Sequence, residues 1–303
     1  MAGMLALLGP VVALGYLANT IRRHAKKSTG LEERSTTSSA GGGAAAYETR
    51  KAVDEYVQFH FGADDDVMPY AAGPRSALDF PARCAALAER HCTALQDFNG
   101  EGPAPTALDI GCAVGGSSFA LARAFTHVLG IDYSHAFVAA AQSLQAAGST
   151  TYEAVVEGDV RRTFSASIPS DIDRTRVRFE QGDACKLSPE LAAFDAIVAA
   201  NLLCRLPDPQ AFLADCPRLV KPGGVLVLVS PHSWLPAWTP KERWVGGYVG
   251  ADGAAVMTTQ GITAALEKDF ELVEQVDMPF LIREHARKFQ WGCSNGMVWR
   301  RRA

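Results

Sequence analysis

The sequence predicts a doubly wound α/β domain built on a mainly parallel, seven-stranded sheet. Beyond Pro105, short apolar runs alternate with amphipathic stretches such as residues 119–125 and 136–147. The apolar runs give the candidate strands 107–110, 128–131, 177–180, 196–200, 225–229, 271–275 and 297–300. This alternation is typical of a parallel sheet covered by helices on both faces. In such sheets a ligand binds at the carboxyl ends of the strands.

The bulk composition narrows the classes of function. The chain has 303 residues, of which 48% are hydrophobic, so it can bury a full core. Its formal net charge is -4, and the basic residues of segment 1–27 leave the remainder more acidic still. An acidic body argues against a nucleic-acid substrate. The 7 cysteines are scattered and show no metal-ligand spacing, so we expect a reducing compartment and no bound metal.

The N-terminal segment has the character of a membrane anchor. Residues 1–21 carry no charge and are strongly apolar, and about 20 such residues can span a bilayer. Basic residues follow this run at 22–27, so the positive-inside rule places the folded domain in the cytosol. The alternatives are an organelle-targeting peptide on a soluble protein, or an accessory helix. We therefore expect a hydrophobic anchor at 1–27, a flexible linker at 28–46 and one folded domain at 47–303.

A glycine-rich turn after the first strand is the strongest local signal. In ALDIGCAVGGSS (107–118), the strand ends at Asp109 and a tight turn leads into a helix. Gly111 and Gly115 let the backbone approach a ligand, and the helix N-terminus is expected to present free N–H groups to a ligand carboxylate. The dinucleotide fingerprint would require glycine where Ala113 stands. The looser turn fits S-adenosylmethionine better than NAD.

Further polar residues follow the next three strands. Asp132 closes the second strand, where a carboxylate can accept both ribose hydroxyls, and Tyr133 comes directly after it. Asp183, followed by Ala184, ends the third strand, where it can accept the adenine amino group. Either acid has an alternative role as a helix or turn cap, but acids at three successive strand ends favour a nucleoside ligand. Asn201, after the fourth strand, is a candidate for orienting the transferred methyl group or the substrate, or for capping the next helix.

This series of motifs resembles class I methyltransferases. DIGCAVG, GIDYS, QGDA, AANLLCRLPDP and LVKPGGVLVLVSP look like the cofactor motifs of that Rossmann-like fold and cover residues 107–231. Over residues 47–303, the expected methyltransferase domain, the chain more narrowly resembles the C-terminal 4-mercaptohistidine N1-methyltransferase domain of ovothiol biosynthesis enzymes. The narrower likeness is carried by YETRKAVDEYVQFHFG, GPRSALDFPARC, SPHSWLPAWTPKERWVGGY and MPFLIREHARKFQWG. It implies S-adenosylmethionine as cofactor and N-methylation of the imidazole of a small thiol-histidine.

The same resemblance implies residues for the acceptor. A carboxylate that accepts the second ring N–H would fix the imidazole tautomer, and an arginine would bind the substrate carboxylate. The candidates for catalysis are Tyr47, Glu48 and Asn201; those for substrate binding are His232, Trp234, Arg283 and Glu284; and Arg83 is the candidate for the cofactor carboxylate. The charges of segment 283–288 also stand at helical spacing, so a solvated helix face is the alternative there. Trp234, Trp238 and Trp244 are expected either to cover the mouth of the site or to form a satellite cluster.

Two other functions remain open from the sequence. The same fold can methylate an oxygen of a membrane quinone or lipid, which the apolar N-terminus favours and the polar segment MPFLIREHARKFQW disfavours. A non-catalytic scaffold that binds the cofactor is disfavoured by the intact acids at 109, 132 and 183. We expect a small-molecule substrate and membrane association through residues 1–21, and the sequence indicates no protein partner.

Overall fold

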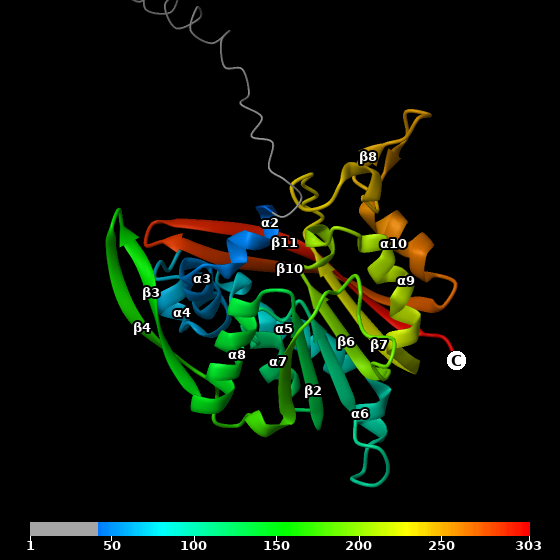
Figure 1. Cartoon of the computed structure of the whole chain (residues 1–303), viewed down its shortest axis with the longest axis horizontal. Helices are drawn as coiled ribbons and strands as arrows, with labels where there is room; N and C mark the ends of the chain where they lie inside the picture. The colour runs from blue at the N-terminus through cyan, green and yellow to red at the C-terminus, as the bar shows by residue number, and fades with distance from the viewer. Residues whose placement is uncertain (1–41) are drawn as a thin grey trace, which may run out of the picture. The chain divides into compact units, whose positions relative to one another are not determined.

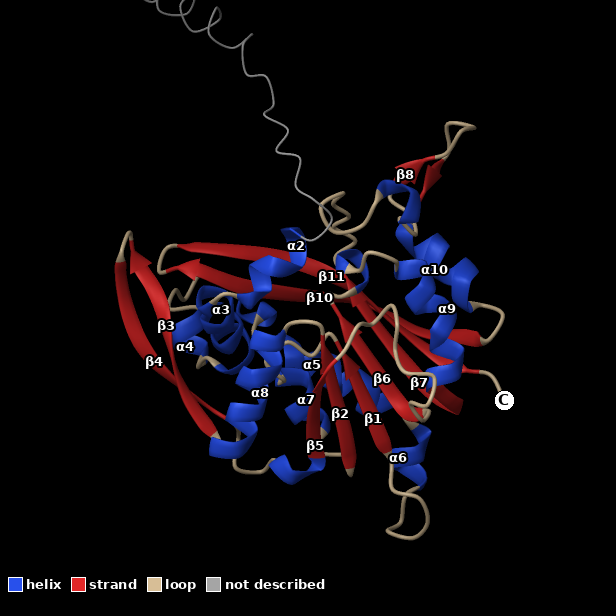
Figure 2. Ribbon diagram, in the orientation of Figure 1, coloured by secondary structure: helices blue, strands red, loops and turns tan. Residues whose placement is uncertain are grey.

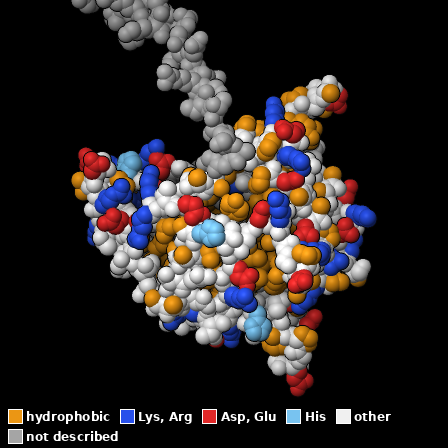
Figure 3. Space-filling view, viewed as in Figure 1, with side chains coloured by type: hydrophobic (Ala, Val, Ile, Leu, Met, Phe, Trp, Pro, Cys, Tyr) orange, Lys and Arg blue, Asp and Glu red, His pale blue; other side chains and the backbone are white. Residues whose placement is uncertain are grey.

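The computed structural model describes residues 42–303. The predicted anchor at 1–27 and residues 28–41 of the predicted linker lie outside the described residues, and the rest of that linker, residues 42–46, is helical and not an unstructured linker as predicted. Within residues 42–303, no helix combines the length and the apolar character needed to cross a bilayer. On the face drawn in Figure 3, acidic and basic side chains are interspersed around groups of hydrophobic ones.

One sheet of seven strands organises the described part of the chain (Figure 1). Its order is β10-β11-β7-β6-β1-β2-β5. The strands are β1 (Thr106–Ile110), β2 (His127–Asp132), β5 (Val177–Gln181), β6 (Phe194–Ala200), β7 (Val220–Ser230), β10 (Phe270–His285) and β11 (Lys288–Arg301). All neighbouring pairs from β5 to β7 are parallel, whereas β11 runs antiparallel to both of its neighbours. The predicted mainly parallel sheet of seven strands is confirmed.

Helices pack on both faces of this sheet (Figure 2). One apolar cluster joins the sheet to α5 (Phe80–His91), α7 (Gly116–Leu121) and α8 (His135–Ala147). A second cluster joins the opposite face to α9 (Pro209–Leu219) and α10 (Thr258–Leu266). Neighbouring residues of one strand enter different clusters: Ala107 belongs to the first and Leu108 to the second. Burial on both faces explains why these strands are continuously apolar in sequence.

Local sequence signals set where the helices begin and end. The Ser134 hydroxyl accepts a hydrogen bond from the Phe137 amide at 3.1 Å and caps α8, which ends at Gly148 with φ +79°. Asp208 caps α9 through the Ala211 amide at 3.1 Å. The other helical segments are α2 (Gly42–Ala45), η1 (Ala46–Glu48), α3 (Arg50–Phe61), α4 (Asp64–Val67), η2 (Arg75–Ala77), α6 (Thr93–Asp97), η3 (Arg174–Arg176), η4 (Leu203–Arg205) and η5 (Lys241–Arg243).

Two hairpins were absent from the sequence-based prediction. Strands β3 (Ser149–Glu157) and β4 (Val160–Ser167) form a separate antiparallel pair, and Tyr152 and Phe164 of this pair are buried. A further short pair is β8 (Tyr248–Val249) with β9 (Ala255–Val256). Strands β10 and β11 are far longer than predicted, so the charged segment 283–288 lies at a hairpin end. The alternative of a solvated helix face for that segment was wrong, because backbone pairing continues as far as His285 and Lys288.

Replacing Phe119 with Ala should test how far the first apolar cluster supports the sheet. Phe119 is fully buried in α7. We expect the free energy of unfolding to fall by about 3–5 kcal/mol, since a buried ring is lost and a cavity remains. Urea unfolding measures this change. The matched control is Val160→Ala on β4, where the side chain is 62% exposed, and its effect should stay within about 0.5 kcal/mol. Equal effects of the two substitutions would contradict the assignment of this core.

Candidate active site

A cavity of about 380 Å³ lies at the carboxyl ends of the central strands. Its wall includes Asp109 at the end of β1, Asp132 at the end of β2, Asp183 just after β5 and Asn201 just after β6. Gly111, Ala113, Tyr133 and Ala184 also line it. The structure therefore brings together, around one cavity, the polar residues that the sequence placed at four strand ends.

The turn after β1 is held in a conformation that depends on left-handed backbone. Gly111, Ala113 and Gly115 have φ values of +74°, +47° and +92°. A Cβ at Gly111 would lie 2.9 Å from a methyl carbon of Leu202, so glycine is needed there for packing as well as for φ. Ala113 adopts positive φ with a side chain present, which is strained unless other contacts hold it.

Asp132 supplies the contact that holds this turn. Its Oδ2 accepts a hydrogen bond from the Ala113 amide at 2.9 Å, and its Oδ1 accepts one from the Ser134 amide at 2.8 Å. Helix α8 is capped by Ser134, so Asp132 is not the N-cap. Burial raises the pKa of Asp132, and the two amide bonds work against that rise. A carboxylate has about four acceptor positions, so two remain for a ligand.

The other two strand-end acids, Asp109 and Asp183, accept hydrogen bonds from residues close to them in the chain. Asp109 is 2% exposed and accepts a hydrogen bond from the Ser118 hydroxyl at 2.6 Å. Burial raises its pKa to about 7. The Asp183 Oδ1 accepts from the Cys185 amide at 2.9 Å, which is the turn-capping bond that the sequence left open, and Asp183 also lines the cavity. One oxygen of Asp183 is thus engaged with its own turn.

Asn201 is fixed by a residue of the antiparallel strand. The backbone of Asn201 has φ +54°, and its backbone N–H donates to the Val229 carbonyl at 2.7 Å. The Ser294 hydroxyl of β11 donates to the side-chain Oδ1 at 2.6 Å. With Oδ1 so engaged, the Nδ2 group is the free donor of this side chain. Strained backbone of this kind is concentrated at functional sites.

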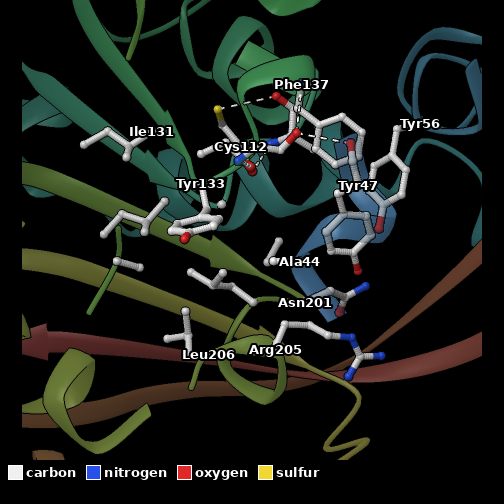
Figure 4. A pocket seen from close by; sticks show the side chains of 18 of the residues that line it. Ala44, Tyr47, Tyr56, Cys112, Ile131, Tyr133, Phe137, Asn201, Arg205 and Leu206 are labelled. Atoms are coloured by element: carbon white, nitrogen blue, oxygen red, sulfur yellow. Dashed lines mark hydrogen bonds between the residues drawn. The ribbon is translucent and has the colours of Figure 1, made fainter. Parts of the chain in front are cut away.

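The other end of the cavity has aromatic walls (Figure 4). The Tyr47 ring centroid lies 5.7 Å from that of Tyr56, 5.4 Å from that of Phe137 and 5.2 Å from that of Trp238. Burial raises the pKa of Tyr56 well above its ordinary value, with the neighbouring Tyr47 hydroxyl adding to the rise. Tyr47, one of the catalytic candidates from the sequence, thus lies in the cavity wall.

Arg205 brings a positive charge to this aromatic end. Its guanidinium carbon is 5.5 Å from the Trp238 ring centroid, and its Nη1 donates to the Ser233 carbonyl at 2.9 Å. Among the described residues that line the cavity, it is the only lysine or arginine. Figure 4 shows Arg205 and Asn201 together near Tyr47, apart from Tyr133 and Ile131.

Two predicted residues are used elsewhere and do not line the cavity. Both oxygens of Glu48 accept backbone N–H groups at the start of α8, from His135 at 3.0 Å and from Ala136 at 3.1 Å. Arg83 donates to the Leu78 carbonyl at 2.9 Å and also to the Pro279 carbonyl. Glu48 therefore anchors η1 on α8, and Arg83 joins α5 to β10.

The four residues predicted for substrate binding also lie outside the cavity wall. Arg283 is buried, donates to the Asp66 carbonyl and has its guanidinium carbon 5.8 Å from the Phe164 ring centroid. Glu284 pairs with Lys288 at 2.6 Å across the β10–β11 turn. The Trp234 indole donates to the Thr258 hydroxyl at 2.8 Å.

His232, the fourth of these residues, sits at φ +53° in the loop after β7, where burial lowers its pKa. The hairpin of β10 and β11 carries Arg283 and Glu284 away from the strand ends, and the loop packs Trp234 against Trp244 with ring centroids 6.1 Å apart. Trp234 and Trp244 thus form the satellite cluster that the sequence offered as the alternative, whereas Trp238 lines the cavity.

The sequence reasoning missed His60 and Arg205. The Nδ1 atom of His60 accepts a hydrogen bond from the Gly116 amide at 3.0 Å, at the first residue of α7. This bond corrects the expectation that the helix N-terminus offers all of its N–H groups to a ligand, because His60 takes one of them. The available signal was Tyr56 and His60 one helical turn apart on an otherwise apolar face, where polar ring atoms need partners.

An Asp109→Asn substitution should change how stability depends on pH. The folded-state pKa of Asp109 lies above its usual value of 3.8, so between these two values the folded protein holds a proton that the unfolded chain loses. Wild-type stability from this group is therefore present below about pH 4 and is lost as the pH rises to about 7.

Asparagine stays neutral and keeps an oxygen for the Ser118 hydroxyl. Relative to wild type, the free energy of unfolding of the variant should rise by up to about 4 kcal/mol between about pH 4 and pH 8. Urea unfolding at several pH values measures the difference. A difference that does not change with pH would contradict the raised pKa.

Comparison with known proteins agrees with this geometry. Residues 108–228 match the family described as "Methyltransferase domain". A ubiquinone biosynthesis O-methyltransferase of Maricaulis maris is 25% identical over 148 residues, covering 44% of this chain and 48% of the relative. A 2-methyl-6-phytyl-1,4-hydroquinone methyltransferase of Synechocystis is 31% identical over 143 residues, covering 47% of this chain and 37% of the relative. The chain spans about half the length of such curated relatives or less.

The fold is shared with a solved structure, the 4+2 cyclase SpnF. The two chains have a TM-score of 0.53 with 16% identity, over 88% of this chain and 98% of SpnF. This likeness supports the fold and leaves the reaction to be argued from the site. Residues 108–228 of this chain thus match a methyltransferase domain, and the strand order and the acids around the cavity agree with that match.

Proposed function

We propose that the chain as a whole transfers a methyl group from S-adenosylmethionine to an oxygen of a small hydroxylated aromatic ring. The observation that carries this proposal is the cavity itself, which continues from the strand-end acids into the space between Tyr47, Tyr56 and Trp238. The relatives named as ubiquinone biosynthesis and hydroquinone methyltransferases support an acceptor of this class.

The residues around the acidic end fit the cofactor. Asp132 keeps two acceptor positions for ribose hydroxyls, and the second oxygen of Asp183 is available for an adenine amino group. Burial raises the pKa of Asp109 and of Asp132, so a cationic ligand in the cavity would favour their charged forms. When bound, S-adenosylmethionine supplies a methyl group on a positively charged sulfur.

The residues of the aromatic end fit a planar acceptor. The rings of Tyr47 and Trp238 offer faces for stacking and exclude water from the acceptor. Holding the acceptor in line with the methyl group accounts for much of the acceleration, because orientation alone is worth roughly 7–11 kcal/mol. The guanidinium of Arg205 favours the ionised form of a phenolic oxygen, which is the better nucleophile. Tyr56 stays protonated and can donate a hydrogen bond to the same oxygen.

A second candidate acceptor is the imidazole of a small thiol-histidine. Arg205 is the observation that favours it, because an amino-acid carboxylate binds well to a guanidinium. In this case Arg205 takes the role that the sequence assigned to Arg283. The resemblance of segments outside residues 108–228 to ovothiol-type methyltransferases adds support.

Membrane association remains part of the proposal. An apolar anchor at residues 1–21, with the catalytic domain facing the cytosol, would place the enzyme beside membrane-bound quinones. An organelle-targeted soluble enzyme is the alternative. Expressing the chain with and without residues 1–27 and separating membranes from the soluble fraction tests this part.

Asp132→Asn should weaken cofactor binding while preserving the fold. The amide has one oxygen in place of two, so it cannot accept from both backbone N–H groups and from ribose. We expect the Kd for S-adenosylhomocysteine, measured by titration calorimetry, to rise about 10- to 100-fold. The matched control is Asp171→Asn, an exposed carboxylate paired with Arg123 at 2.8 Å, which should leave Kd unchanged. An unaltered Kd in the Asp132 variant would refute the ribose assignment.

A panel of acceptors should identify the reaction. We expect a labelled methyl group to pass to phenols and hydroquinones and not to the same rings lacking a hydroxyl. Arg205→Gln should lower kcat/KM for the acceptor about 10- to 100-fold and leave the Kd for S-adenosylhomocysteine unchanged. The control is Arg178→Gln, an exposed side chain on β5. Transfer to mercaptohistidine alone would favour the second candidate, and transfer to neither class would overturn the proposal.

A further inference from the structure

We propose that His60 binds the amino-acid carboxylate of the cofactor, by donating its Nε2–H into the cavity beside Ser117. This inference rests on S-adenosylmethionine as the cofactor and not on the identity of the methyl acceptor. His60 lies near the end of α3, and Ser117 lies in the first turn of α7. Both side chains line the cavity.

The tautomer of His60 follows from its contact with α7. The Gly116 amide donates to Nδ1 at 3.0 Å, so Nδ1 carries a lone pair and the ring proton of the neutral imidazole is on Nε2. Desolvation of the half-buried His60 lowers its pKa to about 3, which keeps the ring neutral near physiological pH. The ring is surrounded by Tyr56, Phe59 and Phe61, with ring centroids 5.3–6.1 Å away. His60 thus lines the cavity with its Nδ1 atom engaged by Gly116, and Nε2–H is the ring donor that remains for a ligand.

The position along the cavity indicates which part of the cofactor lies at His60. With the ribose at Asp132 and the adenine at Asp183, the opposite end of the ligand runs past Gly111 toward the start of α7. A carboxylate at that end needs donors. Among the described residues of this part of the wall, His60, Ser117 and Tyr56 carry side-chain donors, whereas Arg83 is engaged by the carbonyls of Leu78 and Pro279.

The contact with Gly116 also strengthens the donor. An N–H group at the start of a helix carries a partial positive charge. Because this N–H binds Nδ1, it draws electron density from the ring and makes Nε2–H a stronger donor. His60 thus stands between the Gly116 N–H group and the ligand. The sequence had predicted a direct contact between the ligand and the backbone at the start of this helix.

Two substitutions at His60 distinguish the role of Nδ1 from the role of Nε2. In His60→Asn, the shorter side chain can still accept from the Gly116 amide but does not reach into the cavity. In His60→Gln, the side-chain amide reaches the position of Nε2 but leaves the Gly116 amide unpaired. The matched control is His127→Asn at the exposed start of β2.

Two ligands distinguish binding of the carboxylate from binding of the nucleoside. S-adenosylhomocysteine carries the amino-acid group, and 5′-methylthioadenosine lacks it. By titration calorimetry with the full chain, His60→Asn should raise the Kd for S-adenosylhomocysteine about 10- to 100-fold and leave that for methylthioadenosine unchanged. His60→Gln should lose less affinity for S-adenosylhomocysteine than His60→Asn. The control variant should bind both ligands as wild type does.

The outcomes that contradict the proposal are distinct. Equal loss of affinity for both ligands would make His60 a purely structural residue, and no loss would leave the carboxylate to other groups. Nitrogen NMR of the imidazole adds an independent readout, since a proton on Nδ1 at neutral pH would refute the tautomer. If wild-type protein binds neither ligand, the cofactor assignment fails, and that result is separate from the role of His60.

Discussion

The carboxylate of Asp132 joins the ends of two neighbouring strands, and the shape of the cavity depends on that join. One oxygen holds the Ala113 amide of the turn after β1, and the other holds the Ser134 amide that opens α8. The first bond keeps Ala113 at positive φ, a conformation that costs of order 1–3 kcal/mol for a residue with a side chain. The turn, the helix start and the remaining acceptor positions are thus set by one side chain, before any ligand arrives.

Local patterns in the sequence were sufficient to predict the central strands and the acids at their ends. Each central strand is apolar because it is buried on both faces, and each strand-end acid follows directly from where its strand stops. The hairpin of β3 and β4 escaped prediction because its strands are largely polar and lack the long apolar run that marks the central strands. The acceptor side was harder, since it depends on which way long side chains point. The sequence analysis named Arg283 and did not single out Arg205, and only tertiary packing shows that Arg205 reaches the cavity.

The strand-end acids and most of the aromatic wall of the cavity come from different parts of the chain. The matched family region, residues 108–228, contains the three acids and Asn201. Tyr47, Tyr56 and Trp238 lie outside it, in the helical segment before β1 and in the loop after β7. A common nucleoside site can therefore be combined with different acceptor walls. The likeness of SpnF, a cyclase, shows that the fold alone does not determine the reaction.

The anchoring of Glu48 on α8 makes one wall of the cavity sensitive to salt. Segment η1 carries Tyr47 into the cavity wall, and the two Glu48 bonds at 3.0 and 3.1 Å fasten that segment to the start of the neighbouring helix. Movement of Tyr47 out of the wall together with η1 must break these bonds. Because the carboxylate also faces the partial positive charge of the helix start, the fastening weakens as ionic strength rises. Salt therefore loosens the attachment of η1 to α8, and with it the hold on the position of Tyr47 in the cavity wall.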